Sequence, residues 1–494
     1  MKQIGHFIAG KPVDSEPERS GDVFNPATGE VSGRVAFADS DLVDRAVSSA
    51  RDTFADWRHS SLAQRTRVLF TFRELLVARK QELARVITSQ HGKTLDDAEG
   101  EINRGLEVVE YVCGVPQLLK GAHSEGVSRG VDTYSLNQPV GVCAGITPFN
   151  FPAMVPLWMV PVAVACGNTF VLKPSEKDPS AANLLAEWFH EAGLPDGVFN
   201  VVHGDRDAVD ALLAHPDVSA VTSVGSTPVA RHIFQTAAAN GKRVQALGGA
   251  KNHMVVLEDA DLDAAADAAV SAGFGSAGQR CMAISVVVAV GESGDDLVER
   301  IRKRTLDLVV ARGDEEGSDM GPLVTSEHRD KVASYLDKGS AEGAELVVDG
   351  RAHVVPDQGF FLGPSLFDRV TPEMSVYTDE IFGPVLVVVR ADSLEDSVEL
   401  INANRHANGV AVFTRDGGAA RSFQSEIEVG MVGVNVPIPV PVAYHSFGGW
   451  KNSLYGDLHV YGEDGIRFFT RSKVITERWP DAPSTGVSLT FPHG

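Results

Sequence analysis

Cysteine is scarce in this chain of 494 residues, which contains Cys113, Cys143, Cys166 and Cys281. So few cysteines do not form a disulfide framework, and no C-x-x-C pair indicates a zinc site, so we expect no metal. The amino-terminal stretch MKQIGHFIAGKPV has neither the apolar core of a secretion signal nor the composition of a transit peptide. A reducing, cytoplasmic location is therefore the expectation.

Positive charge is also in short supply. Lysine and arginine together number 44, against 66 aspartates and glutamates, and the formal net charge is −22. Such a surface repels phosphate backbones and anionic lipids, which argues against a nucleic-acid or membrane-surface partner. An anionic substrate would need a local basic pocket.

Long uninterrupted apolar runs are absent as well. The most apolar stretch, residues 154–172, is broken by Pro156, Pro161, Gly167 and Asn168. A membrane-spanning helix needs about 20 consecutive apolar residues. This stretch is therefore expected to be a buried core segment.

The amino-terminal third of the chain is predicted to be mostly helical. Residues 1–37 are typical of short strands and turns, and helical spacing of apolar residues predicts amphipathic helices over 39–57, 62–91 and 95–113. Residues 120–138 are polar and poorly periodic, which favours a protruding hairpin.

From Gly141 onward, short apolar runs alternate with helical stretches. The runs are 142–146, 169–172, 199–202, 220–224, 254–257, 284–290, 344–348, 385–389 and 410–414. This alternation is typical of parallel sheets with helices on both faces. It predicts an α/β protein with two tandem open α/β domains and a boundary near residues 246–253.

Cys281 lies in a stretch of unusually small residues, Gly-Phe-Gly-Ser-Ala-Gly-Gln-Arg-Cys-Met-Ala, from Gly273 to Ala283. The lack of bulk would let a carbonyl group and a backbone N–H approach the sulfur. The neighbouring Arg280 brings a positive charge, which favours the reactive thiolate. The alternative is a buried free cysteine beside a solvated arginine.

The same stretch contains a G-x-G-x-x-G pattern at Gly273, Gly275 and Gly278. A dinucleotide-binding fingerprint follows a strand and opens a helix. Here the pattern follows residues 259–272, which are predicted to be helical. We therefore reject the fingerprint interpretation.

Six short strings identify a family resemblance: Pro-Phe-Asn-Phe-Pro at 148–152, Lys-Pro-Ser-Glu at 173–176, Gly-Ser-Thr at 225–227, Leu-Gly-Gly at 247–249, Gly-Gln-Arg-Cys at 278–281 and Glu-Ile-Phe-Gly-Pro at 380–384. Their order and approximate spacing resemble those of the aldehyde dehydrogenase superfamily, over nearly the whole chain. The run Gly-Ala-Lys-Asn-His at 249–253 and the arginine before the cysteine resemble the CoA-acylating methylmalonate- and malonate-semialdehyde dehydrogenases.

The resemblance implies a catalytic pair. Cys281 would be the nucleophile, and the Asn150 side chain, with the Cys281 backbone N–H, would donate to the oxyanion formed when the sulfur adds to an aldehyde. One such donor is typically worth about 2.7–4 kcal/mol in the transition state. The alternative for Asn150 is an asparagine that satisfies a turn beside proline.

The resemblance also implies an NAD site. Lys173 and Glu176 would reach the adenosine ribose, and the Glu176 carboxylate would repel a 2′-phosphate, which favours NAD over NADP. A solvated Lys173–Glu176 ion pair is the alternative. Ala230 replaces a glycine common in the family, which bears on helix packing. The full expected set is Thr147, Phe149, Lys173, Glu176, Gly225, Ser226, Glu380 and Phe382.

The most informative position is one where this chain lacks a glutamate that related enzymes carry. Hydrolytic aldehyde dehydrogenases carry a glutamate immediately before Leu-Gly-Gly, as the general base for water, and this chain has Ala246 there. General-base catalysis typically supplies 10²–10⁴-fold. Water attack on the thioacyl-enzyme should therefore be slow, and coenzyme A becomes the expected acceptor of the acyl group.

Two arginines are candidates for binding a substrate carboxylate, which guanidinium pairs with bidentately. Arg280 precedes the nucleophile, and Arg104 matches a second arginine that the acylating subfamily carries near the substrate entrance. The alternative for Arg104 is an exposed helix residue paired with Glu101 or Glu107.

The expected reaction is NAD-dependent oxidation of malonate or methylmalonate semialdehyde, with loss of CO₂ and transfer to CoA to give acetyl-CoA or propionyl-CoA. A hydrolytic NAD(P)-dependent aldehyde dehydrogenase and a catalytically silent structural protein are the alternatives. The resemblance further implies a homotetramer, built as a dimer of dimers. It implies an NAD-binding domain (1–119 and 139–247), a catalytic domain (248–452) and an oligomerisation element (120–138 and 470–494).

Overall fold

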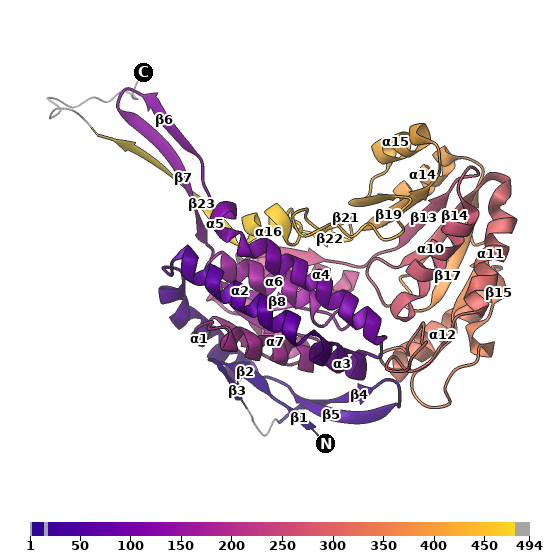
Figure 1. The fold of residues 1–494 in the computed structure, drawn as a ribbon, viewed down its shortest axis with the longest axis horizontal. Helices are drawn as coiled ribbons and strands as arrows, with labels where there is room; N and C mark the ends of the chain where they lie inside the picture. The colour runs from indigo at the N-terminus through magenta and orange to yellow at the C-terminus, as the bar shows by residue number, and fades with distance from the viewer. Residues whose placement is uncertain (1, 14–17, 480–494) are drawn as a thin grey trace.

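Two large sheets lie side by side, and a three-stranded ribbon projects from the first of them (Figure 1). The computed structural model describes residues 2–13 and 18–479. Each sheet is built around parallel strands and carries helices on its faces. The α/β fold class predicted from the sequence is therefore confirmed.

The first sheet has eight strands, of which five central ones are parallel and three edge strands are antiparallel to their neighbours. Sequence alternation predicted four of the five central strands and missed β12, while the short strands expected in residues 1–37 include the edge strand β2. In spatial order the strands are β22 (Leu454–Tyr455), β12 (Arg243–Leu247), β11 (Val218–Val224), β8 (Val142–Ile146), β9 (Thr169–Lys173), β10 (Phe199–Val201), β2 (His6–Ile8) and β3 (Lys11–Val13).

Helices cover both faces of this sheet. The side chains of α1, α8 and α9 share one core cluster, and those of α2 to α7 share another on the opposite face. The bounds are α1 (Ser40–Trp57), α2 (Leu62–Ala78), α3 (Lys80–His91), α4 (Leu95–Cys113), α5 (Val115–Leu118), α6 (Met154–Ala165), α7 (Ser180–Glu191), α8 (Arg206–Ala214) and α9 (Thr227–Ala239).

The single helix expected over residues 62–91 is wrong. Arg79, with φ −110° and ψ 16°, separates α2 from α3. Apolar residues keep a helical period on both sides of Arg79, so periodicity does not reveal one residue that leaves the helical conformation. The break lets α2 pack against α5 and α6 while α3 turns toward β4.

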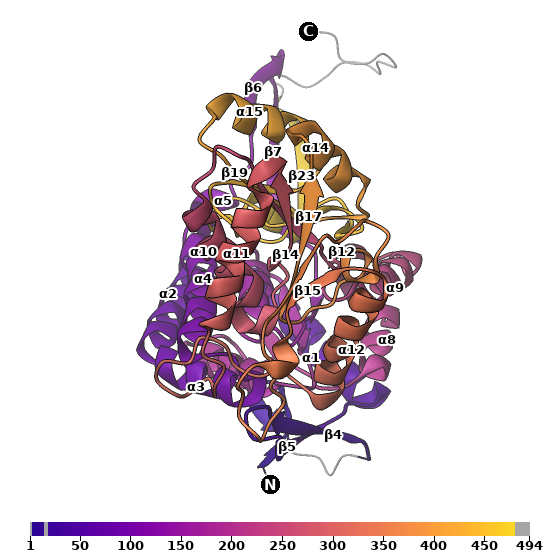
Figure 2. The ribbon, with the colours of Figure 1, turned by 90° about the vertical axis from the view of Figure 1, so that its right-hand side faces the viewer.

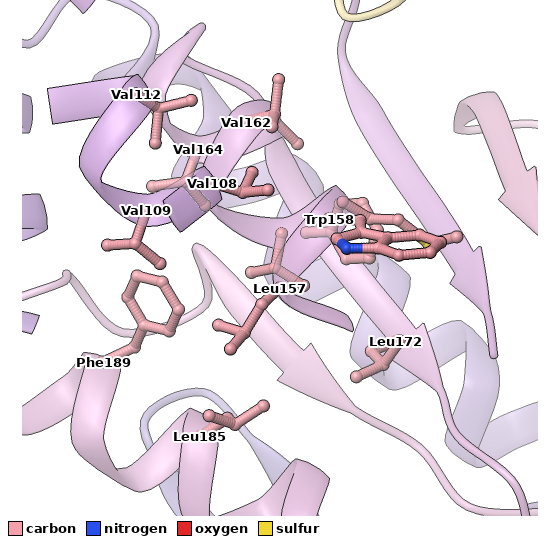
Figure 3. Close-up of a cluster of buried hydrophobic side chains, with 14 of the residues drawn as sticks. Val108, Val109, Val112, Leu157, Trp158, Val162, Val164, Leu172, Leu185 and Phe189 are labelled. Atoms are coloured by element: carbon pink, nitrogen blue, oxygen red, sulfur yellow. The ribbon is translucent and has the colours of Figure 1, made fainter. Parts of the chain in front are cut away.

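The core of the first unit is organised around α6, whose 12 residues are all buried. A helix that is apolar on every side needs partners all round. Leu157 and Val162 lie between the α4 residues Val108 and Val112 and the sheet, and Phe189 of α7 lies next to Val109 (Figure 3). The stretch 154–172 is thus core, as predicted.

The second sheet has seven strands. Six of them are parallel, whereas β15 pairs antiparallel with β16. The prediction that the second domain has a parallel sheet is therefore wrong at this edge. An edge strand lacks a second neighbour to constrain its direction. The strands are β15 (Glu345–Val348), β16 (Ser365–Asp368), β17 (Val385–Ala391), β14 (Ile284–Val290), β13 (Asn252–Val256), β19 (Gly409–Phe413) and β20 (Met431–Val434).

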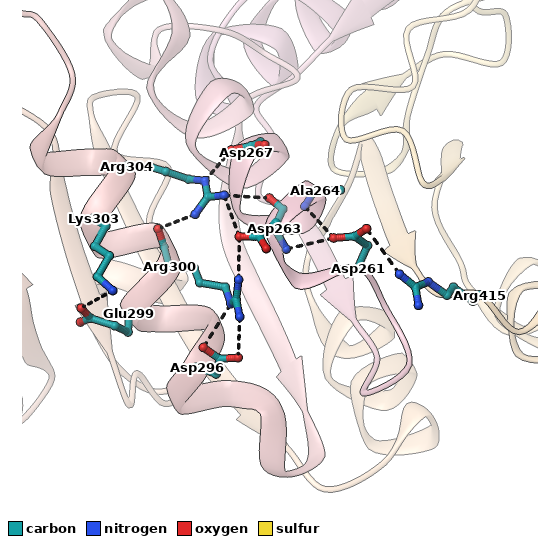
Figure 4. A network of polar contacts seen from close by, with 10 residues as sticks. All are labelled: Asp261, Asp263, Ala264, Asp267, Asp296, Glu299, Arg300, Lys303, Arg304 and Arg415. Carbon is teal, nitrogen blue, oxygen red and sulfur yellow. Dashed lines mark hydrogen bonds and ion pairs between the residues drawn. The ribbon is translucent and has the colours of Figure 1, made fainter.

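In Figure 2, α10 and α11 lie on one side of β14 and β17, and α14 lies on the other. Arg300 and Arg304 of α11 bind Asp263 of α10, and Asp261 extends the network to Arg415 (Figure 4). These pairs are solvent-exposed, so each contributes little to stability. The helices are α10 (Leu262–Phe274), α11 (Gly294–Leu306), α12 (Ser326–Ala341), α13 (Ser375–Thr378), α14 (Leu394–Ala403), α15 (Gly417–Glu426) and α16 (Gly462–Phe468).

The projecting ribbon joins the middle of the chain to its carboxyl-terminal part (Figure 1). β6 (His123–Ser128) and β7 (Val131–Pro139) form the hairpin predicted for residues 120–138, and β23 (Thr470–Arg478) pairs antiparallel with β7 over its whole length. Residues 480–494 of the expected oligomerisation element lie outside the described part of the chain.

Two smaller groups of strands complete the description. At the amino-terminal end, β1 (Lys2–Ile4), β5 (Glu30–Ala36) and β4 (Ser20–Asn25) form a sheet, while β18 (His406–Ala407) pairs with β21 (Trp450–Lys451). Among the helices of the described residues, none combines the length and apolarity needed to cross a membrane.

The fold yields a stability prediction at Phe189. Its ring is fully buried and stacks on Phe72 with ring centroids 3.6 Å apart. Phe189→Ala should lower the free energy of unfolding by about 3–5 kcal/mol, because a cavity replaces the ring. Denaturant titration measures this. Phe70→Ala is the matched control, since Phe70 is 53% exposed on α2. Equal losses in the two variants would contradict the packing described.

Candidate active site

The backbone before Cys281 makes a tight turn. α10 ends at Phe274, and in the following 3-10 turn Ser276 and Ala277 have φ values of 54° and 52°. Gly278 also has positive φ, and a Cβ there would lie 2.2 Å from the Gly383 carbonyl oxygen. Left-handed non-glycine residues cost free energy unless the surroundings hold them. The glycines follow a helix, which confirms the rejection of the dinucleotide fingerprint.

Two asparagine side chains fix the main chain at Cys281. The Asn252 amide donates to the carbonyl oxygens of Cys281 and Ala283 at 2.9 Å each, and the Asn408 amide donates to the Cys281 oxygen at 3.1 Å. Asn252 also accepts from the Gly409 N–H at 3.0 Å. The sulfur is therefore attached to a backbone position held by the first residue of β13 and by the residue that precedes β19.

Cys281 lies at a cavity of about 200 Å³ that brings together segments from both sheets. Seven of the residues predicted for the site line this cavity: Phe149, Asn150, Gly225, Ser226, Cys281, Glu380 and Phe382. Thr147, Lys173, Glu176, Arg104 and Arg280 are not part of this lining. The remaining lining residues are Pro148, Val224, Gly248, Gly249, His328, Lys331 and Ile381.

Asn150 comes after β8, in a loop that leads into α6. Its residue surface is 3% exposed, and its backbone oxygen accepts a hydrogen bond from Lys93 Nζ at 2.7 Å. Within residues 2–13 and 18–479, its side-chain amide makes no hydrogen bond. The amide therefore has its donors available for a group in the cavity.

A second part of the site lies at the carboxyl ends of β9 and β11. Ser226 is the N-cap residue of α9 but makes no side-chain cap hydrogen bond, so its hydroxyl and the first amides of α9 remain available to an anion. Thr147 Oγ1 is buried and has no partner among the described residues. Lys173 and Glu176 form an ion pair of 3.2 Å, the alternative considered from the sequence.

Glu380 is held at the edge of the cavity by a backbone amide of the Gly-Ala-Lys-Asn-His run at 249–253. Its carboxylate accepts from the Ala250 N–H at 2.8 Å, and burial raises its pKa. A Cβ at Gly249 would lie 2.2 Å from Glu380 Oε2, so a glycine is needed there. Lys251 donates to the Val376 and Asp379 carbonyl oxygens at 2.8 Å each and so fixes the Glu380 loop.

The Arg280 charge favours the Cys281 thiolate, as expected, but burial and the Glu380 carboxylate outweigh it. Burial raises the pKa of the Cys281 thiol to about 12, the Glu380 carboxylate adds to the shift, and the Arg280 charge makes a smaller, opposing contribution. Arg280 is also paired with Asp97, which offsets its charge. The thiol is thus neutral near pH 7.

Arg104 makes the contact that the alternative interpretation predicted. Its guanidinium binds Glu107 at 3.0 Å, and both side chains are partly exposed. Burial raises the pKa of Tyr461, while the nearby Arg104 charge opposes that shift and the Cys281 charge adds to it. Arg104 and Cys281 therefore both lie close enough to Tyr461 for their charges to affect the pKa of its hydroxyl.

Sequence reasoning missed several charged residues around the cavity. His328 and Lys331, on α12, line the cavity, and His328 Nε2 donates to the Phe382 carbonyl oxygen at 2.7 Å. Lys93 and Glu101 form a fully buried ion pair behind Asn150. Lys93 lies in the turn between α3 and α4, and Glu101 lies on the buried face of α4. Their separation in the sequence gives no motif.

Comparison with known proteins places this geometry in a family. The family model described as the aldehyde dehydrogenase family matches residues 13–475. The chain belongs to the aldehyde dehydrogenase family.

Similar proteins cover the whole chain. A malonate-semialdehyde dehydrogenase from Pseudomonas aeruginosa is 56% identical over 100% of both chains, and malonate-semialdehyde dehydrogenase 2 from Geobacillus kaustophilus is 49% identical over 97% of this chain and 99% of its own.

Solved structures are also similar to this chain over nearly its whole length. A methylmalonate-semialdehyde dehydrogenase from Oceanimonas doudoroffii aligns with a TM-score of 0.96 and 54% identity, over 98% of this chain and 99% of its own. A protein assigned the same activity, from Sinorhizobium meliloti and complexed with NAD, aligns with a TM-score of 0.96 and 53% identity over the same shares.

The raised pKa of Cys281 yields a prediction for the ligand-free protein. Alkylation of Cys281 by iodoacetamide should accelerate about tenfold per pH unit between pH 7 and pH 9, because the thiolate fraction does so below the pKa. Glu380→Gln should accelerate alkylation, since the carboxylate raises that pKa. Peptide mass spectrometry follows Cys281 separately from the three buried cysteines. A plateau below pH 8 would contradict the environment described.

Proposed function

We propose that this protein oxidises malonate or methylmalonate semialdehyde with NAD and passes the decarboxylated acyl group to coenzyme A. The observation that carries the proposal is the pairing of Cys281 with the available Asn150 amide at one cavity, with Ala246 at the position where hydrolytic family members carry their base. The full-length likeness to malonate-semialdehyde dehydrogenases supports the substrate class.

The residues present fit NAD. Ser226 and the first amides of α9 suit a pyrophosphate, Thr147 Oγ1 is a buried hydroxyl without a partner in the described chain, and Glu176 offers acceptors to a ribose. Lys173 would change its partner from Glu176 to a ribose hydroxyl. Glu380 and Phe382 would hold the nicotinamide end. NAD supplies the acceptor for the hydride when it is bound.

Within this site the chain's own groups carry the carbon–sulfur chemistry. The Cys281 sulfur, after losing its proton, would add to the aldehyde carbon, and the Asn150 amide with the Cys281 N–H would stabilise the resulting oxyanion. After oxidation a thioester remains on Cys281. Its acyl group carries a carboxylate β to the carbonyl, so loss of CO₂ would leave an enolate that the thioester stabilises, and a proton from water would convert this enolate to the acyl thioester.

Release by water is disfavoured because no base stands where one is needed. Ala246 is fully buried on β12, paired with Ser223 of β11 and Tyr455 of β22. Of the cavity-lining residues that the structure describes, Glu380 alone carries a carboxylate, and the Ala250 N–H holds it. Coenzyme A brings a better nucleophile than water and can release the acyl group without that base.

We also propose that Arg104 and Arg280 select a carboxylate-bearing substrate. Their present partners are Glu107 and Asp97, so a substrate carboxylate has to share or replace these contacts. Because the two ion pairs are partly exposed, their loss costs little. The proximity of Arg104 and Cys281 to Tyr461 supports this assignment.

The arrangement of elements supports the division proposed from the sequence. Residues 1–119 and 139–247 contribute the parallel strands of the first sheet, residues 248–452 contribute the second sheet, and β6, β7 and β23 form the ribbon. We propose that this ribbon, whose strand β6 has a largely exposed outer edge, pairs with another copy in a homotetramer.

The central test of the proposal is the need for coenzyme A. With malonate semialdehyde and NAD alone, we expect one burst of NADH per active site followed by turnover about 10²-fold or more slower than with coenzyme A, because water lacks a base. Stopped-flow absorbance measures both phases, and Cys281→Ala should show neither. Equal steady rates with and without coenzyme A would instead establish the hydrolytic alternative.

A second substrate tests the role of the two arginines in substrate selection separately from the transfer to coenzyme A. Acetaldehyde lacks the carboxylate, so it should react with a lower kcat/KM than malonate semialdehyde under the same conditions. If the two aldehydes reacted equally well, the role given to Arg104 and Arg280 would be wrong, while the CoA dependence could still hold.

A further inference from the structure

A buried ion pair lies directly behind the Asn150 loop and takes no part in the mechanism above. Lys93 Nζ and Glu101 Oε2 are 2.7 Å apart, and both side chains are 0% exposed. Two charges removed from water need excellent geometry and further hydrogen bonds to be tolerated. Each member of this pair uses its remaining capacity on the same short segment of chain, the loop from Asn150 to Met154.

Lys93 acts on the first residue of that loop. Its Nζ donates to the Asn150 carbonyl oxygen at 2.7 Å and lies 4.3 Å from the centre of the Phe151 ring. A charge-assisted hydrogen bond of this length fixes the peptide plane that follows Asn150. The direction of the Asn150 side chain is set by the same backbone atoms.

Glu101 acts on the far end of the loop. Its Oε1 accepts from the N–H groups of Ala153 and Met154 at 2.8 and 3.1 Å. These are N-terminal amides of α6, whose own N-cap residue makes no side-chain cap bond. Glu101, on α4, therefore caps α6 from a different helix.

The position of Lys93 is itself fixed by the second unit of the protein. A Cβ at Gly313 would lie 2.3 Å from the Lys93 carbonyl oxygen, and a Cβ at Gly321 would lie 2.0 Å from that of Gly92. Leu95 donates its N–H to the Gly313 oxygen at 3.0 Å. The turn carrying Lys93 is thus pressed between the two units that form the cavity.

The charges around the pair balance. Burial, and after it the neighbouring Glu101 carboxylate, raise the pKa of Asp178 well above its usual range, while the Lys93 charge opposes that shift. Burial, with Lys93 next in importance, lowers the pKa of His91 well below its usual range. Lys93 and Glu101 form the ion pair of this cluster, and each is the other's counter-ion.

We propose that Lys93 and Glu101 are positioning residues that set the orientation of the Asn150 amide toward the oxyanion. The proposal rests on the oxyanion role proposed above for Asn150. It adds that the rate of NADH formation depends on a charge pair that does not touch the substrate. A displacement of a catalytic group by about 1 Å can cost 10²-fold in rate.

The test is a double-mutant cycle between Lys93→Met and Asn150→Ala, read as the rate constant of the first NADH burst. Asn150→Ala should slow the burst by about 10²–10³-fold, and Lys93→Met by about 10-fold or more. The double variant should be no more than about 3-fold slower than Asn150→Ala, because Lys93 acts through Asn150. The KM for NAD should stay within about 2-fold in Lys93→Met.

Lys242→Met is the matched control for general loss of stability. Lys242 is also a buried lysine that donates to carbonyl oxygens, at His215 and Val218, but these lie at the amino end of β11, away from Cys281. This control should lose stability and keep the wild-type burst. If Lys93→Met does not fold, Glu101→Gln, which keeps the shape and removes the charge, replaces it in the same cycle.

The outcomes separate the two proposals. Two outcomes would overturn the positioning role and leave the oxyanion role intact. In the first, Lys93→Met shows a burst at the wild-type rate. In the second, Lys93→Met slows the burst by the same factor in the wild-type protein and in Asn150→Ala. A wild-type burst in Asn150→Ala would overturn the oxyanion role and the positioning role with it.

Discussion

The active site depends on one backbone carbonyl group, that of Cys281, which hydrogen bonds hold in place. The oxygen of Cys281 accepts hydrogen bonds from Asn252, the first residue of β13, and from Asn408, which immediately precedes the neighbouring parallel strand β19. The preceding turn holds Ser276 and Ala277 in a left-handed conformation that only a rigid surrounding can maintain. The nucleophile is thus fixed through its backbone before any ligand is present, and the remaining parts of the site are arranged around it.

Buried cations hold the loops that face the sulfur. Lys93 binds the Asn150 carbonyl from one side of the cavity, and Lys251 binds two carbonyls of the Glu380 loop from the other. Lys251 is 3% exposed, and its burial lowers its pKa to about 8. In such surroundings a lysine that lost its partners would be costly, so each loop is restrained to one position.

Much of this architecture could be predicted from the sequence. Central parallel strands are short apolar runs, so β8, β9, β14 and β17 were found closely, and the residues after them mark the ligand edge of the sheet. The run 344–348 predicted the strand β15, but its antiparallel direction and the break at Arg79 could not be predicted, because both depend on what the segments pack against. The strings shared with a known family supplied the roles that spacing alone leaves open.

The electrostatics of the site were the least predictable part. Arg280 adjoins Cys281 in the chain, which suggested an activated thiolate, but its partner Asp97 lies 183 residues away and only the folded chain brings them together. The Lys93 contact with Asn150 spans 57 residues and belongs to no motif. Local sequence reports which charges are present, whereas the fold decides which of them are already paired.

Intact-mass measurement of the protein after reaction with malonate semialdehyde and NAD, without coenzyme A, tests the central claim most directly. The account predicts a single acyl group on Cys281 that persists for many turnover times and disappears when coenzyme A is added. Unmodified protein throughout, with NADH accumulating beyond one equivalent per site, would contradict it.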